Sequence, residues 1–200
     1  YINKIKIPDG KGMTTGTMKK CMPVFDSITS GYLLFTTTDV FVSKHQDGYD
    51  WFEWAGAHYP VVEFHPFQQA PNHPNRNSNP INPYPKWINS FGIQTPKGYS
   101  CLFVQPFHRE SPFTILPGIV DTDSYIAPVN FPFVLNDPNF TGLIPAGTPI
   151  AQVIPFERKS WKMSIGKESD KTSIDKLNLK KISKMFDGYK NIWWHKKEYK

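Results

Sequence analysis

Cysteine is scarce in this sequence, and long hydrophobic runs are missing. Cys21 and Cys101 are the two cysteines among 200 residues, and they lack the spacing of a metal site. One disulfide is compatible with them, but we expect two reduced, partly buried thiols, as in cytoplasmic proteins. No apolar run approaches the roughly 20 residues that cross a bilayer, and nothing resembles a signal peptide. We therefore expect a cytoplasmic protein with no membrane segment.

The motifs of several enzyme classes are absent as well. The histidines show none of the HxH, HExxH or HxD spacings that announce zinc sites. A glycine-rich phosphate loop, a nucleophile elbow and a Cys/His dyad are also missing. In the absence of these motifs, the sequence predicts no metal site and indicates no cofactor.

Aromatic residues and prolines, in contrast, are abundant. Aromatics make up 15% of the chain, and there are 19 prolines. Proline interrupts helices and suits short strands joined by turns. The length of 200 residues fits one domain, or one domain with an appendage, and allows a sizeable core.

Positive charge is concentrated near the C-terminus. Residues 1–156 carry 10 Lys and Arg against 11 Asp and Glu, whereas residues 157–200 carry 13 against 6. The body is thus nearly neutral and the tail is basic. The overall net charge of +6 therefore does not by itself indicate a nucleic-acid-binding body.

Short runs rich in Phe, Tyr, Val and Thr predict strands along most of the chain. Two such runs lie in residues 22–44, the Asp47-Gly48 step after them signals a hairpin, and residues 58–67 read as a further strand. From 87 to 156, apolar runs recur at regular spacing and are broken by Gly or Pro. This pattern is typical of an all-β barrel or sandwich.

Residues 66–86 interrupt that pattern with six prolines and five asparagines. Long irregular segments inside compact domains usually have a role. The segment could cover a sheet edge, form a lid or wrap a neighbouring subunit, and a plain surface loop is the alternative.

The character of the sequence changes again after Trp161. Apolar residues recur at roughly helical intervals there, namely Ile174, Leu177, Ile182, Met185, Phe186, Tyr189 and Trp193. We expect one or two amphipathic helices with a stop near Gly188. Trp193 and Trp194 could stack on nucleic acid, but we favour an anchoring role on the core or a partner.

These observations divide the chain into three parts. We expect an extended lead-in at 1–21, a β domain at 22–157 that includes the arm 66–86, and a basic helical segment at 158–200.

Three motifs, in order, carry a resemblance to a known superfamily. They are "IQTPKGYSCLFVQPF", "PGIVDTDSY" (117–125) and "IPAGTPIAQVIPF". They resemble elements of the dUTPase and dCTP-deaminase superfamily, which has the β-clip fold. More weakly, "SGYLLFTTTDVFV" (30–42) resembles the first motif of dUTPases.

Residues 20–162 also resemble an uncharacterised family of bacterial and phage proteins, which brings no established activity with it. If the chain is phage-encoded, its place would be the host cytoplasm or the virion. The resemblance implies a mainly β fold, a dUTPase-like β-clip barrel or sandwich, followed by the C-terminal amphipathic helical segment.

The resemblance assigns roles to individual residues. Asp121 takes the place of the carboxylate that activates water, and Tyr125 that of the aromatic under the sugar ring. Gln152 takes the place of the phosphate-side glutamine, while Arg109 and Ser111 match the phosphate-binding motif only with a shift. Mg²⁺ would be needed only if the chain hydrolyses nucleotides.

The sequence departs from the superfamily at several of these positions. Ser124 is inserted before Tyr125, Pro149 stands where the family has Arg, and leucine (Leu33 or Leu34) replaces the acid of the first motif. A lysine-rich helix replaces the glycine-rich C-terminal arm. For Asp121 and Asp123 we favour a turn in which the carboxylates cap backbone N–H groups. We expect Asp121 at a strand end and Asp123 in the turn that follows it.

Three hypotheses about function remain open. The first is a non-enzymatic β-clip protein for assembly or for binding a ligand or partner. The second is a nucleotide pyrophosphohydrolase or deaminase with an altered site around Asp121. The third is nucleic-acid binding through residues 158–200. The superfamily resemblance also implies a homo-oligomer, with a trimer favoured, and a nucleotide or protein partner.

Overall fold

The computed structural model describes residues 6–8, 10, 14–16, 18, 21–66, 69, 84–166, 171–183 and 188–199. The chain divides into two compact units, of which one is residues 31–158 and the other combines residues 1–30 with 159–200. Among the described residues, no helix has the length and apolarity needed to span a membrane.

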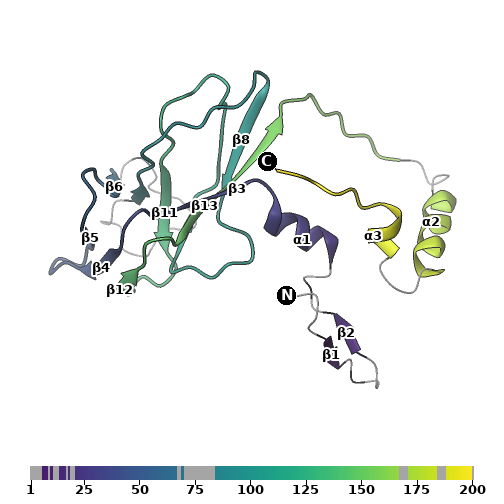
Figure 1. Cartoon of the computed structure of the whole chain (residues 1–200), viewed down its shortest axis with the longest axis horizontal. Coiled ribbons are helices and arrows are strands. Elements are labelled where there is room, and N and C mark those ends of the chain that lie inside the picture. The colour runs from purple at the N-terminus through teal and green to yellow at the C-terminus, as the bar shows by residue number, and fades with distance from the viewer. Residues whose placement is uncertain are drawn as a thin grey trace. The chain divides into compact units, whose positions relative to one another are not determined.

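Three antiparallel sheets build the described part of the unit of residues 31–158 (Figure 1). In strand order, the first sheet contains β10 (Gly118–Val120), β8 (Tyr99–Val104), β13 (Pro149–Glu157) and β3 (Tyr32–Phe35). The second contains β6 (Val62–His65), β7 (Tyr84–Trp87), β11 (Phe131–Leu135) and β9 (Phe113–Ile115). The third contains β12 (Gly142–Ile144), β4 (Val40–Lys44) and β5 (Asp50–Trp54). The prediction of a mainly β protein is confirmed.

The predicted hairpin joins β4 to β5. The His45 N–H donates to the Tyr49 carbonyl over 2.8 Å, and the Gly48 N–H donates back to the His45 carbonyl over 2.8 Å. Gly48 has φ of 81°, a conformation that glycine adopts without steric cost. In β4 the side chains of Val40 and Val42 are buried while Phe41 between them is exposed, as expected of a strand with one face on the core.

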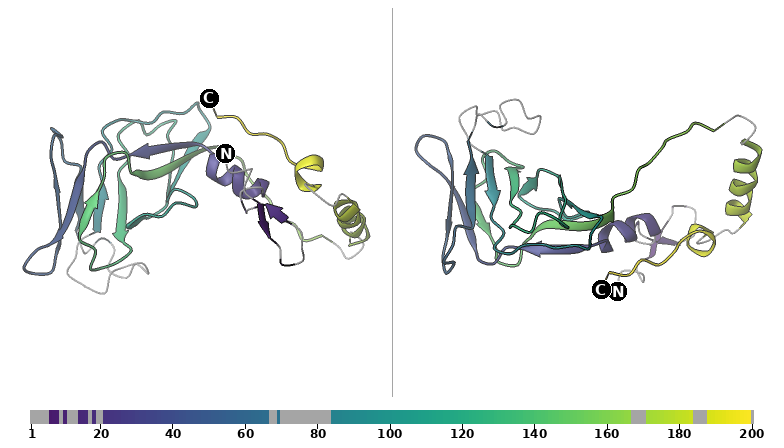
Figure 2. Two further views of the ribbon diagram at one scale, coloured as in Figure 1. Left: turned by 60° about the horizontal axis from the view of Figure 1, so that its bottom comes forward. Right: turned by 90° about the horizontal axis from the view of Figure 1, so that it is seen from above.

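Aromatic rings from several strands form the centre of this unit, and the views in Figure 2 show the sheets surrounding one interior. Phe133 of β11 stacks on Trp87 of β7, with ring centroids 4.9 Å apart. It also meets Phe113 of β9 at 5.3 Å and Phe52 of β5 edge-on at 5.7 Å. The second and third sheets thus share one core, which Cys101, Phe103 and Val153 of the first sheet complete.

The other unit contains helices and one small strand pair. Its elements are β1 (Lys6–Pro8), β2 (Thr14–Gly16), α1 (Met22–Thr29), α2 (Lys171–Ser183) and α3 (Gly188–Ile192). β1 and β2 pair as antiparallel strands within the part expected as an extended lead-in. Residues 22–30, expected within the β domain, contain α1 and cluster with residues 159–200.

The helical segment near the C-terminus has two helices in its described part. α2 ends at Ser183, and Gly188 begins α3 instead of stopping a helix. Ile174 and Leu177 of α2 are exposed, so neither is packed on a core. Met185 and Phe186 lie outside the described residues, and so does most of the proline-rich arm, namely residues 67–68 and 70–83.

Trp194 is held to helix α1 of the same unit. Its indole N–H donates to both carboxylate oxygens of Asp26 in α1, over 3.0 and 2.9 Å. Lys197 pairs with the same carboxylate at 2.6 Å and lies 5.8 Å from the centroid of the Trp194 ring. Burial raises the pKa of Asp26, but the hydrogen bonds from Lys197 and Trp194 outweigh it and leave that pKa below its usual value.

The two cysteines are free thiols. Cys101 is buried in β8, as a small apolar side chain would be. Cys21, expected to be partly buried, is exposed, because it precedes α1 outside the β core.

Candidate functional site

The stretch 117–125 forms a strand end followed by a tight turn, as predicted. β10 ends at Val120, and the Asp121 carbonyl then accepts the N–H groups of Ser124 and Tyr125 over 3.0 and 2.8 Å. Asp121 therefore lies directly after the strand and Asp123 lies in the turn. The two carboxylates are held close together on one short loop.

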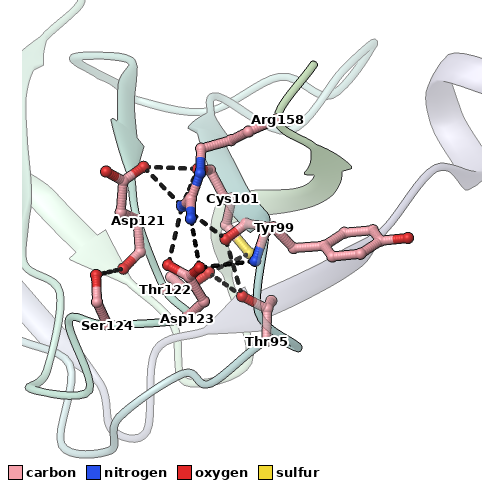
Figure 3. A network of polar contacts seen from close by, with 10 residues as sticks. Thr95, Tyr99, Cys101, Asp121, Thr122, Asp123, Ser124 and Arg158 are labelled. Carbon is pink, nitrogen blue, oxygen red and sulfur yellow. Dashed lines mark hydrogen bonds and ion pairs between the residues drawn. The ribbon is translucent and has the colours of Figure 1, made fainter.

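Arg158, the residue that follows β13, binds both acids (Figure 3). Its guanidinium grips Asp123 with two nitrogens, one of them 2.9 Å from Oδ1 and the other in contact with Oδ2. The first nitrogen also lies 3.2 Å from Asp121 Oδ1. A planar guanidinium matches a carboxylate in this two-pronged geometry, which lysine cannot reproduce.

Groups at and just before the start of β8 complete the cluster. The Ser100 hydroxyl donates to Asp121 Oδ1 over 2.6 Å, and the Gly98 N–H donates to Asp123 Oδ2 over 2.8 Å. Arg158 also donates to the Tyr99 carbonyl over 3.1 Å. The acids, the arginine and the start of β8 thus form a connected network of charge-assisted hydrogen bonds, which we call the Arg158 clamp (Asp121, Asp123, Arg158, Ser100 and Gly98).

A second set of hydrogen bonds, made by Thr122, fixes the same turn. The hydroxyls of Thr95 and Thr122 are 2.8 Å apart, and the Thr122 hydroxyl donates to Cys101 Sγ over 3.4 Å. Thr122 is fully buried. The turn is therefore held to β8 on both sides, which favours a structural role for it.

The two acids differ in accessibility and in electrostatic environment. The side chain of Asp123 is 6% exposed, whereas that of Asp121 is 61% exposed. The hydrogen bond from Arg158, followed by that from the Gly98 N–H, lowers the pKa of Asp123 to about 2. Asp123 is therefore ionised at neutral pH and has its proton-accepting oxygens already occupied.

The other candidate residues lie on β13 and in the loop between β8 and β9. Gln152 is buried in β13, where its side-chain oxygen accepts the Phe107 N–H over 3.0 Å. Arg109 follows β8 and lines a cavity of about 610 Å³, together with Phe107, His108 and Glu110. The Ser111 hydroxyl accepts the Phe113 N–H over 3.3 Å. Gln152 thus supports the loop that carries Arg109.

The sheet register separates the candidates into two groups. Val120 pairs with Cys101 near the start of β8, whereas Gln152 pairs with Val104 at its end. Along a strand this separation from Asp121, beside Ser100, to Gln152 corresponds to roughly 13 Å. Asp121 and Tyr125 therefore lie at one end of β8, with Gln152 and Arg109 at the other, and one chain does not join them into a single site.

Arg158 is the residue that the sequence analysis missed. A signal for it was present, because Arg158 is one of three arginines among 23 basic residues. In a chain whose basic residues are mostly lysines, an arginine directly after a long strand indicates a need for the guanidinium geometry.

Comparison with known proteins adds no identification. No protein-family model matches the sequence, and no curated protein is significantly similar to it. Among the described residues, no group of three His, Cys, Asp or Glu side chains is placed to hold a metal ion.

The Arg158 clamp makes a prediction about acid stability. Because the folded pKa of Asp123, about 2, lies below the ordinary value of 3.8, its contribution is present above pH 4 and is lost as the pH falls through 2. The stability of Asp123→Asn should therefore depend less on pH between 4 and 2 than that of the wild type. Melting curves at pH 7, 4 and 2.5 measure this.

The control for this prediction is Asp137→Asn, which removes a carboxylate that caps the Asn139 N–H in another turn. It should leave the acid dependence close to that of the wild type. If the melting temperatures of the wild type and Asp123→Asn fall equally as the pH is lowered, the Arg158 clamp does not hold Asp123 ionised.

Proposed function

We propose that this chain is a non-enzymatic protein with a β-clip fold, and that its role is assembly and partner binding through the first sheet. The observation that carries the proposal is the apolar outer face of that sheet. Ile119, Leu102 and Ile154 are paired across β10, β8 and β13, so their side chains share one face. Ile119 is 64% exposed.

The surroundings of this face resemble those of a protein interface. Phe156, two residues beyond Ile154 on the same strand, is also exposed. The Arg158 clamp follows at the end of the same strands and supplies charged groups beside the apolar residues. An apolar centre with a polar rim is the usual composition of an interface core and its edge. We name Ile119, Leu102, Ile154 and Phe156 the Ile119 face.

The state of the two acids supports a non-enzymatic role. A general base needs a free carboxylate beside a space for substrate and water. Asp123 is held by Arg158 and Gly98, and Asp121 Oδ1 accepts from Ser100 and lies against Arg158. The cluster resembles a structural tie between β8, β10 and β13.

We expect the chain to form a homo-oligomer, with a trimer favoured, through the Ile119 face. Light scattering at micromolar concentration should give a mass of three 23.0 kDa chains. Ile119→Asp should reduce this mass to that of one chain without lowering the melting temperature of the monomer, since Ile119 is exposed. The oligomer should dissociate because the carboxylate introduced by Ile119→Asp would lose its hydration if it were buried in the interface.

The matched control is Leu143→Asp, which places the same charge on an exposed strand residue of the third sheet. It should leave the mass unchanged. A concentration-independent mass of one 23.0 kDa chain for the wild type would refute the self-association part of the proposal.

The alternative function is nucleotide hydrolysis, and one observation favours it. Arg109 and His108 line the 610 Å³ cavity beside the loop that Gln152 supports, as an anion site would require. A second copy could then supply Asp121 to that cavity. Melting temperature and pyrophosphate release, measured with nucleoside triphosphates and Mg²⁺, distinguish this alternative, because a bound ligand stabilises the folded state.

A further inference from the structure

A separate cavity lies at the hairpin between β4 and β5, and neither the Ile119 face nor the Arg158 clamp includes it. Its volume is about 280 Å³. Six residues line it: His45, Asp47, Tyr49, Asp50, Trp51 and Phe64. Four of these carry aromatic rings and the other two are aspartates. The cavity is smaller than the roughly 300–1,000 Å³ of pockets for drug-sized ligands, so it suits a small group.

The fold keeps large aromatic rings exposed at this place. Trp51 is 50% exposed and Phe64 is 39% exposed, although both belong to strands. The rings of His45 and Trp51 lie 6.3 Å apart and are inclined by 41°, so they do not stack and bury each other. The Trp51 indole N–H donates to Glu53 over 3.2 Å, which orients the ring.

The charges around the cavity favour a cation. Asp50 is nearly buried and is ion-paired with Lys44, so its charge is balanced. Asp47 is well exposed, and its carboxylate lies 3.3 Å from His45 Nδ1. With Asp50 balanced by Lys44, Asp47 supplies the accessible carboxylate beside the rings, and its negative charge favours a cation.

We propose that this cavity binds a quaternary ammonium group. The faces of Trp and other aromatic rings attract cations, and a nearby carboxylate adds to the attraction. A primary ammonium would need acceptors for three N–H donors, whereas Asp50 is already paired and the rings accept weakly. A trimethylammonium group has no donors and presents methyl groups to the rings, so it loses no hydrogen bonds on entering.

The trimethylammonium group could be part of free choline, a choline lipid or a trimethylated lysine. The first probe is choline chloride, titrated into the full chain by calorimetry and followed by the Trp51 indole N–H signal in NMR spectra. We expect a dissociation constant on the order of 1 mM. The neutral isostere 3,3-dimethylbutan-1-ol has the same shape without the charge, and it should bind at least about tenfold more weakly.

Variants locate the binding at this cavity. Trp51→Ala should weaken choline binding at least about tenfold, and Asp47→Asn about threefold. The control Phe41→Ala removes an exposed ring of β4 that does not line the cavity, and it should bind as the wild type does. Any one of three results would overturn the proposal. Choline and its isostere would bind equally, choline would not bind at 50 mM, which is about fifty times the expected dissociation constant, or Trp51→Ala would bind choline as tightly as the wild type does.

Two further arms identify the source of the group. Phosphatidylcholine vesicles are compared with phosphatidylglycerol vesicles, and a trimethyllysine peptide with its unmodified lysine counterpart. Binding to phosphatidylcholine but not phosphatidylglycerol vesicles assigns a choline lipid, and binding to the trimethyllysine peptide but not its lysine counterpart assigns a trimethylated lysine. The comparison of choline with its isostere uses the wild-type chain, so it tests the cavity even if a variant fails to fold.

Discussion

Phe133→Ala is expected to destabilise the unit of residues 31–158 by about 3–5 kcal/mol, the range for removing a fully buried phenylalanine. Phe133 is 0% exposed, and its ring contacts three others. Those rings are Phe52 of β5, Trp87 of β7 and Phe113 of β9. Alanine would leave a cavity between two sheets, because the strands around it are fixed by their own hydrogen bonds. Urea unfolding at 25 °C measures the loss.

The matched control is Phe41→Ala, which removes the same ring from a strand position that is 47% exposed. Its loss should stay near or below about 1 kcal/mol, because little buried apolar area is removed. Similar losses for both variants would mean that Phe133 is not at the centre of the core.

The strands of this unit were predictable because their signals are local. The alternation of Val40, Phe41 and Val42 and the turn at Asp47-Gly48 each lie within a few residues. The strand-end position of Asp121 was predictable for the same reason, since an apolar run, a glycine and two acids adjoin. Local chemistry of this kind determines the turn type before any tertiary contact forms.

Helix α1 could not be predicted in the same way. It is eight residues long, and Cys21 at its N-cap makes no side-chain capping hydrogen bond. Short helices are marginal by themselves and depend on tertiary contacts. Here the contact is between Asp26 and Trp194, 168 residues apart in the sequence. Pro23 near the first helical position was the one local signal.

The candidate site was partly predictable for a similar reason. The closeness of Asp121 and Asp123 follows from their spacing, but Arg158 lies 35 residues beyond Asp123. Only the pairing of β8 with β13 brings Arg158 to the turn. That same pairing places Gln152 opposite Val104, so the register separates the residues that the motif comparison had grouped. A motif gives residue types in order, whereas strand register decides which of them meet.

Gly31→Ala is expected to produce the other large loss of stability. Gly31 has φ of +65°, and a Cβ atom there would lie 1.9 Å from the Val153 carbonyl oxygen and 2.8 Å from its carbon. These are backbone atoms of β13, so they cannot rotate away as a side chain could. The adjacent pair of Tyr32 and Val153 belongs to the β3–β13 ladder. The methyl group should therefore separate β3 from the sheet edge.

Two costs add up in Gly31→Ala, namely the left-handed backbone conformation and the overlap with β13. A substitution at Gly56 measures the first cost alone. Alanine in the left-handed region costs about 1–2 kcal/mol by itself. Gly56 has φ of +81° and open space around its Cβ position, so Gly56→Ala should lose only that amount. Gly31→Ala should lose more than about 3 kcal/mol, because the overlap with β13 is added to the same backbone cost. Hydrogen exchange should show lost protection in β3 only for Gly31→Ala. If both variants lose the same stability, β3 does not approach β13 as closely as the Gly31–Val153 contact requires.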